Sequence, residues 1–322
     1  MTARITLALL FAIPAALAYP WRTAADRWLL GVAVAVVVVL FAWWRGLFVT
    51  EMVRRRVAIW RRNRRGGEHS RRPAEPGTYV ASVLRVEPSS ADGLPLPLIA
   101  GYVDRYGVKA DKIRIVSRDR PAERSTWIAV TVGAPENLAA LQARSPELPL
   151  RQTADVVARR LADHLREVGW RVAPVEGADL VADTPVAAGV ETWRGLRTES
   201  GYIAAYRLTV DDRLPETLAA VTAHEADEIW TAIDITGTAT HSVVTAGCAL
   251  VGPQRPDARA PIAGLVPAHG DHRRALEALA PTSVTRLAGR PTSTDLVHRL
   301  TWPVDRRPTG ELAEAVGPLN RI

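Results

Sequence analysis

Hydrophobic residues form two long uninterrupted runs at the start of this chain. The runs Ile5–Trp21 and Trp28–Trp44 each contain 17 residues and no charge. At about 1.5 Å per residue, each would span roughly 25 Å as a helix, and a few further apolar residues bring the second to the thickness of a bilayer core. The pattern predicts a transmembrane hairpin in residues 1–49, with spans of about 5–21 and 28–48. A cleaved signal peptide over the first run is the alternative.

An arginine-rich segment follows the second run. Residues 45–72 contain ten arginines against Glu51 and Glu68. Basic residues next to a membrane span stay on the cytoplasmic side. We therefore expect a multi-pass protein of the inner (plasma) membrane whose chain after residue 50 is cytoplasmic, whether or not the first run is retained.

Residues 50–77 are predicted to form a juxtamembrane helix and a linker. Val49, Val53, Val57 and Trp60 recur at helical spacing with arginines between them. Such a helix suits the anionic headgroups of a lipid surface or a docking site on a partner subunit. The tryptophans would anchor it at the interface. The candidate surface residues are Trp43, Trp44, Arg45, Arg54, Arg55, Arg56, Trp60, Arg61 and Arg62.

Short apolar patterns of two periods alternate after the linker. Strands are predicted at 78–86, 112–117, 125–132, 170–175, 190–197, 202–210, 228–236 and 240–251. Helices are predicted at 95–106, 135–144, 154–168, 214–225 and 271–279. The mixture indicates one α/β or α+β domain over residues 78–322. No internal repeat is visible in the sequence.

The strongest helical pattern lies at Ala154–Val168. Thr153 is placed to cap its first turn and Gly169 to end its last. Its apolar stripe consists of Val157, Leu161, Leu165 and Val168.

The charge of the chain is concentrated at the predicted membrane edge. Residues 1–72 hold 13 of the 41 basic residues and 3 of the 34 acidic ones. Residues 73–322 therefore carry 28 basic and 31 acidic residues, a net charge of −3. A nucleic-acid surface needs clustered basic residues on the folded domain, so we expect no nucleic-acid partner.

Several enzyme classes lack their motifs. The only lysines, Lys109 and Lys112, do not follow glycine, which excludes a Walker A loop, and no serine lies in a G-x-S-x-G elbow. Cys248 is the only cysteine, which excludes an intrachain disulfide and a cysteine-held metal. Its apolar surroundings predict a buried thiol. We expect no cofactor, no metal and no small-molecule substrate.

Three polar clusters could be mistaken for sites. His224-Glu225 starts an H-E-x-x-H pattern but has Glu228 in place of the second histidine, so a solvated helix end is favoured over a metal site. In His269-Gly270-Asp271-His272, Asp271 is predicted to cap a helix and His272 to be exposed in its first turn. Asp211-Asp212 lacks the D-x-D spacing of sugar-nucleotide transferases, which favours a turn or cap role for Asp212.

Two stretches resemble the EccE family of actinobacterial type VII (ESX) secretion systems. They are LPLPLIAGYVDRYGVKADKIRIVSRD at 94–119 and ENLAALQARSPELPLRQTADVVARRLADHLREVGWRV at 136–172. Trp43-Trp44-Arg45-Gly46 after two apolar runs agrees with the same architecture, and the resemblance covers most of the chain. The length is closest to the shorter members, including the paralogue of the iron- and zinc-linked system.

The resemblance implies a non-catalytic subunit of the inner-membrane secretion complex. Such subunits act beside EccB, EccC and EccD, with EccC supplying ATP hydrolysis. The family offers no established catalytic residues to transfer to this chain. Its cytosolic domain has been likened to nucleotide-sugar transferases, so a membrane-tethered, degenerate glycosyltransferase-like enzyme is the alternative. That alternative predicts a pocket lined by Asp211, Asp212 or His272.

Overall fold

The computed structural model describes residues 13, 28, 30–32, 34, 43–44, 47–64, 78–87, 93–175, 184–185, 189–238, 241–289, 292–293 and 296–304. The chain divides into two units, residues 1–66 and 67–322, which we describe separately.

Residues 43–44 and 47–64 of the N-terminal unit form a short hairpin followed by a long helix. Strands β1 (Trp43–Trp44) and β2 (Leu47–Phe48) pair antiparallel, and α3 (Val49–Arg64) follows directly. The predicted extension of the second span through residues 43–48 as a helix is therefore wrong. Aromatic residues such as these favour paired strands.

The predicted transmembrane spans lie largely outside the described residues. Residues 13, 28, 30–32 and 34 are helical. No helix within the described part of the chain has the length and apolar character needed to cross a membrane.

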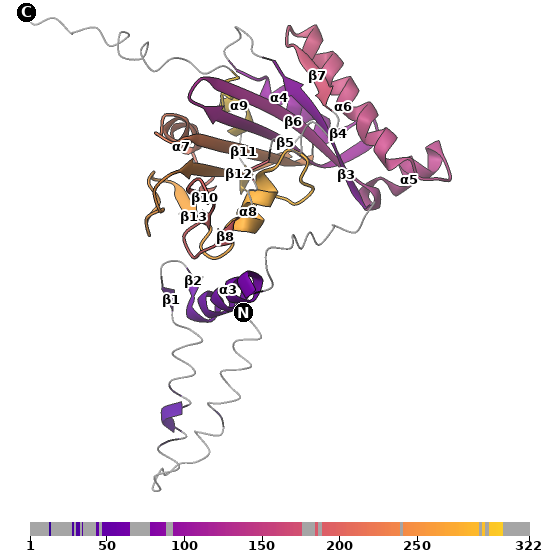
Figure 1. Ribbon diagram of the computed structural model, residues 1–322. Coiled ribbons are helices and arrows are strands. Elements are labelled where there is room, and N and C mark those ends of the chain that lie inside the picture. The colour runs from indigo at the N-terminus through magenta and orange to yellow at the C-terminus, as the bar shows by residue number, and fades with distance from the viewer. Residues whose placement is uncertain are drawn as a thin grey trace, which may run out of the picture. The chain divides into compact units, whose positions relative to one another are not determined.

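The second unit is built on one antiparallel sheet (Figure 1). Its order is β7-β3-β6-β5-β11-β12-β10-β9-β8, and every pairing in it is antiparallel. The main strands are β3 (Tyr79–Val86), β5 (Val108–Arg120), β6 (Glu123–Gly133), β7 (Val172–Val175), β10 (Tyr202–Leu208), β11 (Glu228–Thr238) and β12 (His241–Gly252). The mixed class predicted from the sequence is confirmed, and the antiparallel pairing makes it α+β rather than α/β.

Short elements complete the sheet and cover its faces. The short strands are β4 (Asp104–Arg105), β8 (Val190–Glu191), β9 (Leu196–Arg197), β13 (Leu265–Pro267) and β14 (Thr292–Ser293). The helices are α4 (Leu96–Ala100), the 3-10 turn η1 (Gly101–Val103), α5 (Ala134–Arg144), α6 (Leu150–Glu167), α7 (Leu214–Thr222), α8 (His272–Leu279) and α9 (Leu296–Arg299). The single strand predicted at 190–197 is instead β8 and β9, separated by a turn that the Thr192 hydroxyl closes on the Gly195 carbonyl.

The sheet buries apolar side chains on both faces. Helices α4, α6, α7 and α9 pack on one face, against residues such as Ile115 and Ile128. Helix α8 packs on the other, against a cluster that includes Val116 and Trp127. These strand positions alternate along β5 and β6, as the period of two requires.

Two β-α-β-β units make up the centre of the sheet. β3-α4-β5-β6 and β10-α7-β11-β12 occupy mirrored positions in the strand order, and they meet where β5 pairs with β11. Both helices begin with Leu-Pro, at Leu96 and Leu214, and the same offset of 118 residues relates Ile115 to its paired partner Ile233. The sequence showed no repeat because these positions need only apolar character: Val130 of β6 corresponds to Cys248 of β12.

Helix α6 confirms the strongest sequence prediction but begins four residues earlier. Thr153 lies inside the helix, fully buried, and its hydroxyl accepts a hydrogen bond from Arg144, so the predicted cap is wrong. Pro149 occupies the N-cap position instead. Gly169, with φ +90°, ends the helix as predicted, because a left-handed residue there favours glycine.

Candidate functional site

Helix α3 presents an apolar stripe between arginines. Val53, Val57 and Trp60 lie on one side of the helix and are 55%, 41% and 53% exposed. Arg54 and Arg56 are exposed, and Arg55 is half-buried. Exposed apolar residues beside arginines form the amphipathic surface that the sequence predicted. What this surface contacts stays a prediction.

The remaining predicted surface residues are less fully described. Arg61 and Arg62 belong to the last turn of α3, and Trp43 and Trp44 form β1. Arg45 lies outside the described residues.

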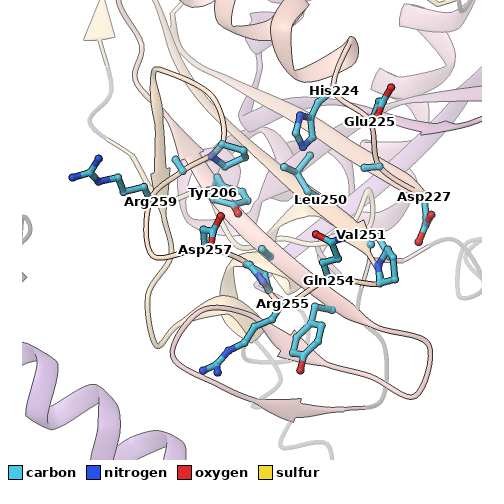
Figure 2. A pocket seen from close by; sticks show the side chains of 18 of the residues that line it. Tyr206, His224, Glu225, Asp227, Leu250, Val251, Gln254, Arg255, Asp257 and Arg259 are labelled. Carbon is cyan, nitrogen blue, oxygen red and sulfur yellow. The ribbon is translucent and has the colours of Figure 1, made fainter.

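A cleft of about 900 Å³ opens beside the second β-α-β-β unit (Figure 2). Ala204 and Tyr206 of β10 and Leu250 of β12 form its floor, on the same face of the sheet as α6. Two segments form its banks: residues 223–227, which follow α7, and residues 253–261, which follow β12.

The banks of the cleft carry opposite charge. Figure 2 shows Glu225 and Asp227 on one side and Arg255 and Arg259 on the other, with Asp257 beside Tyr206. All four bank residues are exposed. Counted by bank, the first carries −2 with His224 neutral, and the second carries +1 because Asp257 offsets one arginine.

Tyr206 at the floor stays protonated near neutral pH. Burial raises the pKa of Tyr206 to about 12, and the nearby Cys248 and Asp257 add to the rise. Its hydroxyl makes no hydrogen bond to the residues that the structure describes, so it can donate one to a molecule in the cleft.

The structure places the His224-Glu225 cluster in this cleft. Helix α7 ends at Thr222, so the cluster lies in the loop beyond it and not on the helix end that the sequence predicted. Glu225 and Asp227 are exposed, in agreement with the predicted solvated acidic surface. No group of three potential metal ligands lies together in the described ranges.

The prediction for His272 is wrong. Its side chain is completely buried between α8 and β10, where Nδ1 accepts the N–H of Ala205 at 3.1 Å. His269 stacks on Trp193, with ring centroids 5.5 Å apart. Asp271 occupies the predicted N-cap position of α8, but its side chain makes no capping hydrogen bond. The sequence could not indicate that α8 turns its first residue toward a strand.

Asp211 and Asp212 have structural partners. Asp211 Oδ1 accepts the N–H of Arg213 at 2.9 Å. Asp212 lies in the turn before α7, which confirms its predicted position in a turn. Asp212 is exposed and pairs with Arg299 at 2.7 Å. Neither aspartate lines the cleft, and neither does His272. The three residues that the enzyme alternative required are therefore not brought together there.

A buried charge cluster is the feature that the sequence reasoning missed. Arg114 donates from Nε and Nη2 to both carboxylate oxygens of Asp234, at 2.6 and 2.8 Å, and both side chains are fully buried. Lys112 donates to the carbonyls of Ser283 and Thr285, at 2.9 and 2.6 Å. Burial lowers the pKa of Lys112 to about 7, and the neighbouring Arg114 contributes.

The cluster fixes the chain that follows α8. Arg114 also donates to the carbonyls of Ala278, Ala280, Ser283 and Thr285, and Asp234 accepts the N–H of Leu287 at 2.8 Å. The alternating pattern of β5 correctly separated two faces of the strand. It could not show that residues 278–287 bury the polar one.

Known proteins resemble this chain over almost its whole length. A 50% identity over 291 residues, 90% of this chain and 91% of the relative, links it to "ESX-3 secretion system protein EccE3" of Mycolicibacterium smegmatis. Proteins of the same name from two strains of Mycobacterium tuberculosis are 50% and 49% identical over 313 residues, 93% of this chain and 91% of each relative. Residues 120–208 match a family model described as "Putative type VII ESX secretion system translocon, EccE". The chain belongs to the EccE family.

The EccE match includes part of the region that suggested the family. Residues 136–172 lie inside the matched segment, which runs from the end of β5 to the end of β10. The α3 surface and residues 223–227 and 253–261 of the cleft lie outside it. The EccE family model therefore establishes membership and tests neither surface.

Proposed function

We propose that this EccE protein is a non-catalytic structural subunit of a type VII (ESX) secretion complex in the inner membrane. The observation that carries the proposal is the 50% identity, over about nine-tenths of both chains, to proteins named for the ESX-3 secretion system. The same names favour an ESX-3-type paralogue. EccB, EccD and the ATPase EccC are the proposed partners, and the chain itself supplies no ATP hydrolysis.

The N-terminal unit provides the attachment in this proposal. Residues 5–21 and 28–42 form the membrane hairpin, and α3 lies at the cytoplasmic headgroups. There Arg54, Arg55, Arg56, Arg61 and Arg62 face anionic lipid or a partner, and the tryptophans anchor the interface. Residues 78–322 form the cytoplasmic domain that packs on the other subunits.

The use of reactive side chains supports a structural role. His272 accepts a backbone hydrogen bond, Asp211 closes a turn and Asp212 pairs with Arg299. Arg114 and Asp234 hold backbone segments. A catalytic site needs such groups to converge on a shared space where a substrate can react, and these groups are committed to internal contacts.

Complementation separates the structural role from the enzyme alternative. A strain lacking this chain is supplied with Asp211→Ala, Asp212→Ala, His224→Ala or Asp227→Ala, and secretion is measured together with assembly of the complex. We expect wild-type secretion from each variant. Loss of secretion by one of them with normal assembly would establish a catalytic role and overturn the proposal.

A triple substitution in α3 serves as the positive control. Arg54→Glu, Arg55→Glu and Arg56→Glu together reverse the charge of the proposed attachment surface. Each basic residue near an anionic surface contributes about 1 kcal/mol, so this variant should lose membrane or complex association and secretion together.

A further inference from the structure

Tyr106 lies at the tip of the hairpin between β4 and β5, in a backbone conformation that tyrosine rarely adopts. Arg105 pairs with Val108 across the hairpin, so Tyr106 and Gly107 form a two-residue turn. Their φ values are +57° and +73°, and positive φ at both positions is typical of a type I′ turn. Such turns favour asparagine followed by glycine, because a bulky side chain makes a positive φ unfavourable. The turn alone therefore does not account for a tyrosine at position 106.

Two arginines contact the ring of Tyr106. The guanidinium carbons of Arg105 and of Arg160, which belongs to α6, lie 5.1 and 4.8 Å from the centre of the ring. Tyr102 contacts the same ring edge-on, with the ring centroids 6.2 Å apart. Tyr102 is buried, and its hydroxyl donates to the carbonyl of Arg160 at 3.0 Å, which joins the hairpin to α6. Tyr106 is thus held between these side chains although it is 56% exposed.

Neither arginine has an anionic partner in the part of the chain that the structure describes. There the guanidiniums of Arg105 and Arg160 form no ion pair and donate no hydrogen bond, and their contacts are with the tyrosine rings. Asp163, one turn further along α6, pairs with Arg166 at 2.7 Å and is not available to them. Arginine binds carboxylates through paired N–H groups. The two guanidiniums can therefore receive carboxylates from another molecule.

The charge of the surrounding domain favours a short acidic segment over an extended anionic surface. Residues 73–322 carry a net charge of −3, so a nucleic acid or an anionic bilayer would meet net repulsion there. A short acidic segment needs only the local pair of cations. Tyrosine and arginine are also the residue types that are enriched at the centres of protein interfaces.

We propose that Arg105, Tyr106 and Arg160 form a docking site for an acidic segment of a partner subunit. Carboxylates of that segment bind the two guanidiniums, and an apolar or aromatic side chain beside them packs on the exposed part of the Tyr106 ring. The unfavourable φ of Tyr106 is then the consequence of presenting this ring at the tip of the hairpin. This inference rests on the proposed function, since it requires a partner in the assembled complex.

Photo-crosslinking in native membranes identifies the occupant. The full-length chain carries a benzophenone amino acid in place of Tyr106, which keeps an aromatic ring in the turn. The control carries it in place of the exposed Val190 on β8, at one end of the strand order. We expect crosslinks from position 106 to one partner segment that contains at least two aspartates or glutamates. We expect no crosslink to that segment from position 190.

A synthetic peptide of the mapped segment then measures affinity for the purified full-length chain. An exposed ion pair stabilises by up to about the equivalent of fivefold in affinity, and reversing a charge adds repulsion. We therefore expect Arg160→Glu to weaken binding on the order of fivefold or more. A peptide with one acidic residue replaced by lysine should recover most of that loss. The matched control is Arg151→Glu, at an exposed position near the start of α6, and it should leave the affinity unchanged.

Tyr106→Asn separates docking from folding. Asparagine suits the first position of a type I′ turn, so relief of the turn should offset the lost ring contacts and leave the melting temperature close to that of the wild type. Removal of an aromatic side chain from the centre of an interface should weaken peptide binding at least about fivefold. A purely structural tyrosine predicts the opposite, a lower melting temperature with unchanged affinity.

Each other outcome of the crosslinking overturns the inference. These outcomes are a crosslink from position 106 only to lipid, only to nucleic acid, to a segment without acidic residues, or to nothing. If the chain enters the complex and position 106 gives no crosslink to an acidic segment, the proposed function stands and the inference falls. If the chain does not enter a complex at all, the proposed function falls as well.

Discussion

The first β-α-β-β unit of the domain leads into α5 and α6, whereas the second leads into the short connection 253–264. The strands, their order and the Leu-Pro starts of α4 and α7 correspond in the two units. In the first unit, Leu161 and Leu165 of α6 complete a closed core. In the second, a cleft with charged banks lies over the corresponding strands. Shared strand order therefore does not determine how the same face is covered: a helix covers it in the first unit, and the segments 223–227 and 253–264 cover it in the second.

The largest expected effect comes from breaking the Arg114–Asp234 ion pair, which joins β5 of the first β-α-β-β unit to β11 of the second. Asp234→Ala leaves Arg114 buried without its carboxylate, and removing one member of a buried pair costs about 3–5 kcal/mol. Thermal and urea unfolding of the full-length chain would measure the loss. Asp163→Ala, in an exposed pair with Arg166, is the control and should cost less than about 1 kcal/mol. Equal losses of unfolding free energy for the two variants would show that the Arg114–Asp234 pair does not hold the two β-α-β-β units together.

Replacing one apolar side chain in each connection by alanine should show that the two connections contribute unequally to stability. Leu161→Ala in α6 removes a completely buried side chain and should cost about 2–5 kcal/mol. Ile262→Ala in the second connection removes a half-buried side chain and should cost clearly less. Both are measured by urea unfolding. A larger loss for Ile262→Ala would contradict the comparison.

Lys112 should make stability depend on pH. Its pKa is about 7 in the folded chain and its ordinary value is 10.5, so between pH 7 and 9 the unfolded chain binds more protons. The free energy of unfolding should therefore rise with pH across this window, by on the order of 2 kcal/mol. Urea midpoints of the wild type and Lys112→Met test this, and the variant should lose the rise. Persistence of the full rise in Lys112→Met would assign it to other groups.

The window ends near pH 9 because other groups act in the opposite direction. Burial raises the pKa values of the Cys248 thiol and of Tyr206, so above their ordinary values the folded chain retains protons that the unfolded chain has lost. Stability contributed by these groups falls as pH rises further.

The smallest expected effect concerns two glycines, Gly169 after α6 and Gly252 before the second connection. Gly169 has φ +90°, and placing a side chain in this left-handed conformation costs roughly 1–2 kcal/mol. Gly252, where the second connection begins, has neither a positive φ nor an atom within 4 Å of an added Cβ. Gly169→Ala should therefore lower the unfolding free energy, while Gly252→Ala stays within about 0.5 kcal/mol of the wild type. Equal effects on the melting temperature would contradict this.

The sequence predicted the parts of the fold that depend on local periodicity. The β5 and β6 strands, the buried Cys248 and three of the four stripe residues of α6 are confirmed. The fourth stripe residue, Val168, was predicted wrongly, because it lies beyond the last residue of α6 and is 51% exposed. A period of two assigns residues to two faces of a strand but does not show what covers either face. Lys112 and Arg114 therefore gave no sign of being buried.

The site depended on contacts between distant segments. His272 is buried because α8 crosses the sheet at β10, 67 residues earlier in the chain. The cleft joins the segment after α7 to the segment after β12. Neither segment has apolar periodicity, so the sequence offered only the His224-Glu225 cluster as a sign, and it was interpreted as a solvated helix end. The arginine surface of α3 was predicted from sequence, and its contacts remain to be tested.

Affinity purification of the tagged full-length chain from its own membranes in mild detergent tests the central claim most directly. The mass of the purified species on native gels and its subunits by mass spectrometry are the measurements. A structural role predicts a large complex that contains an ATPase subunit and further membrane subunits. Recovery of the chain alone, or as a small homo-oligomer, would contradict the account.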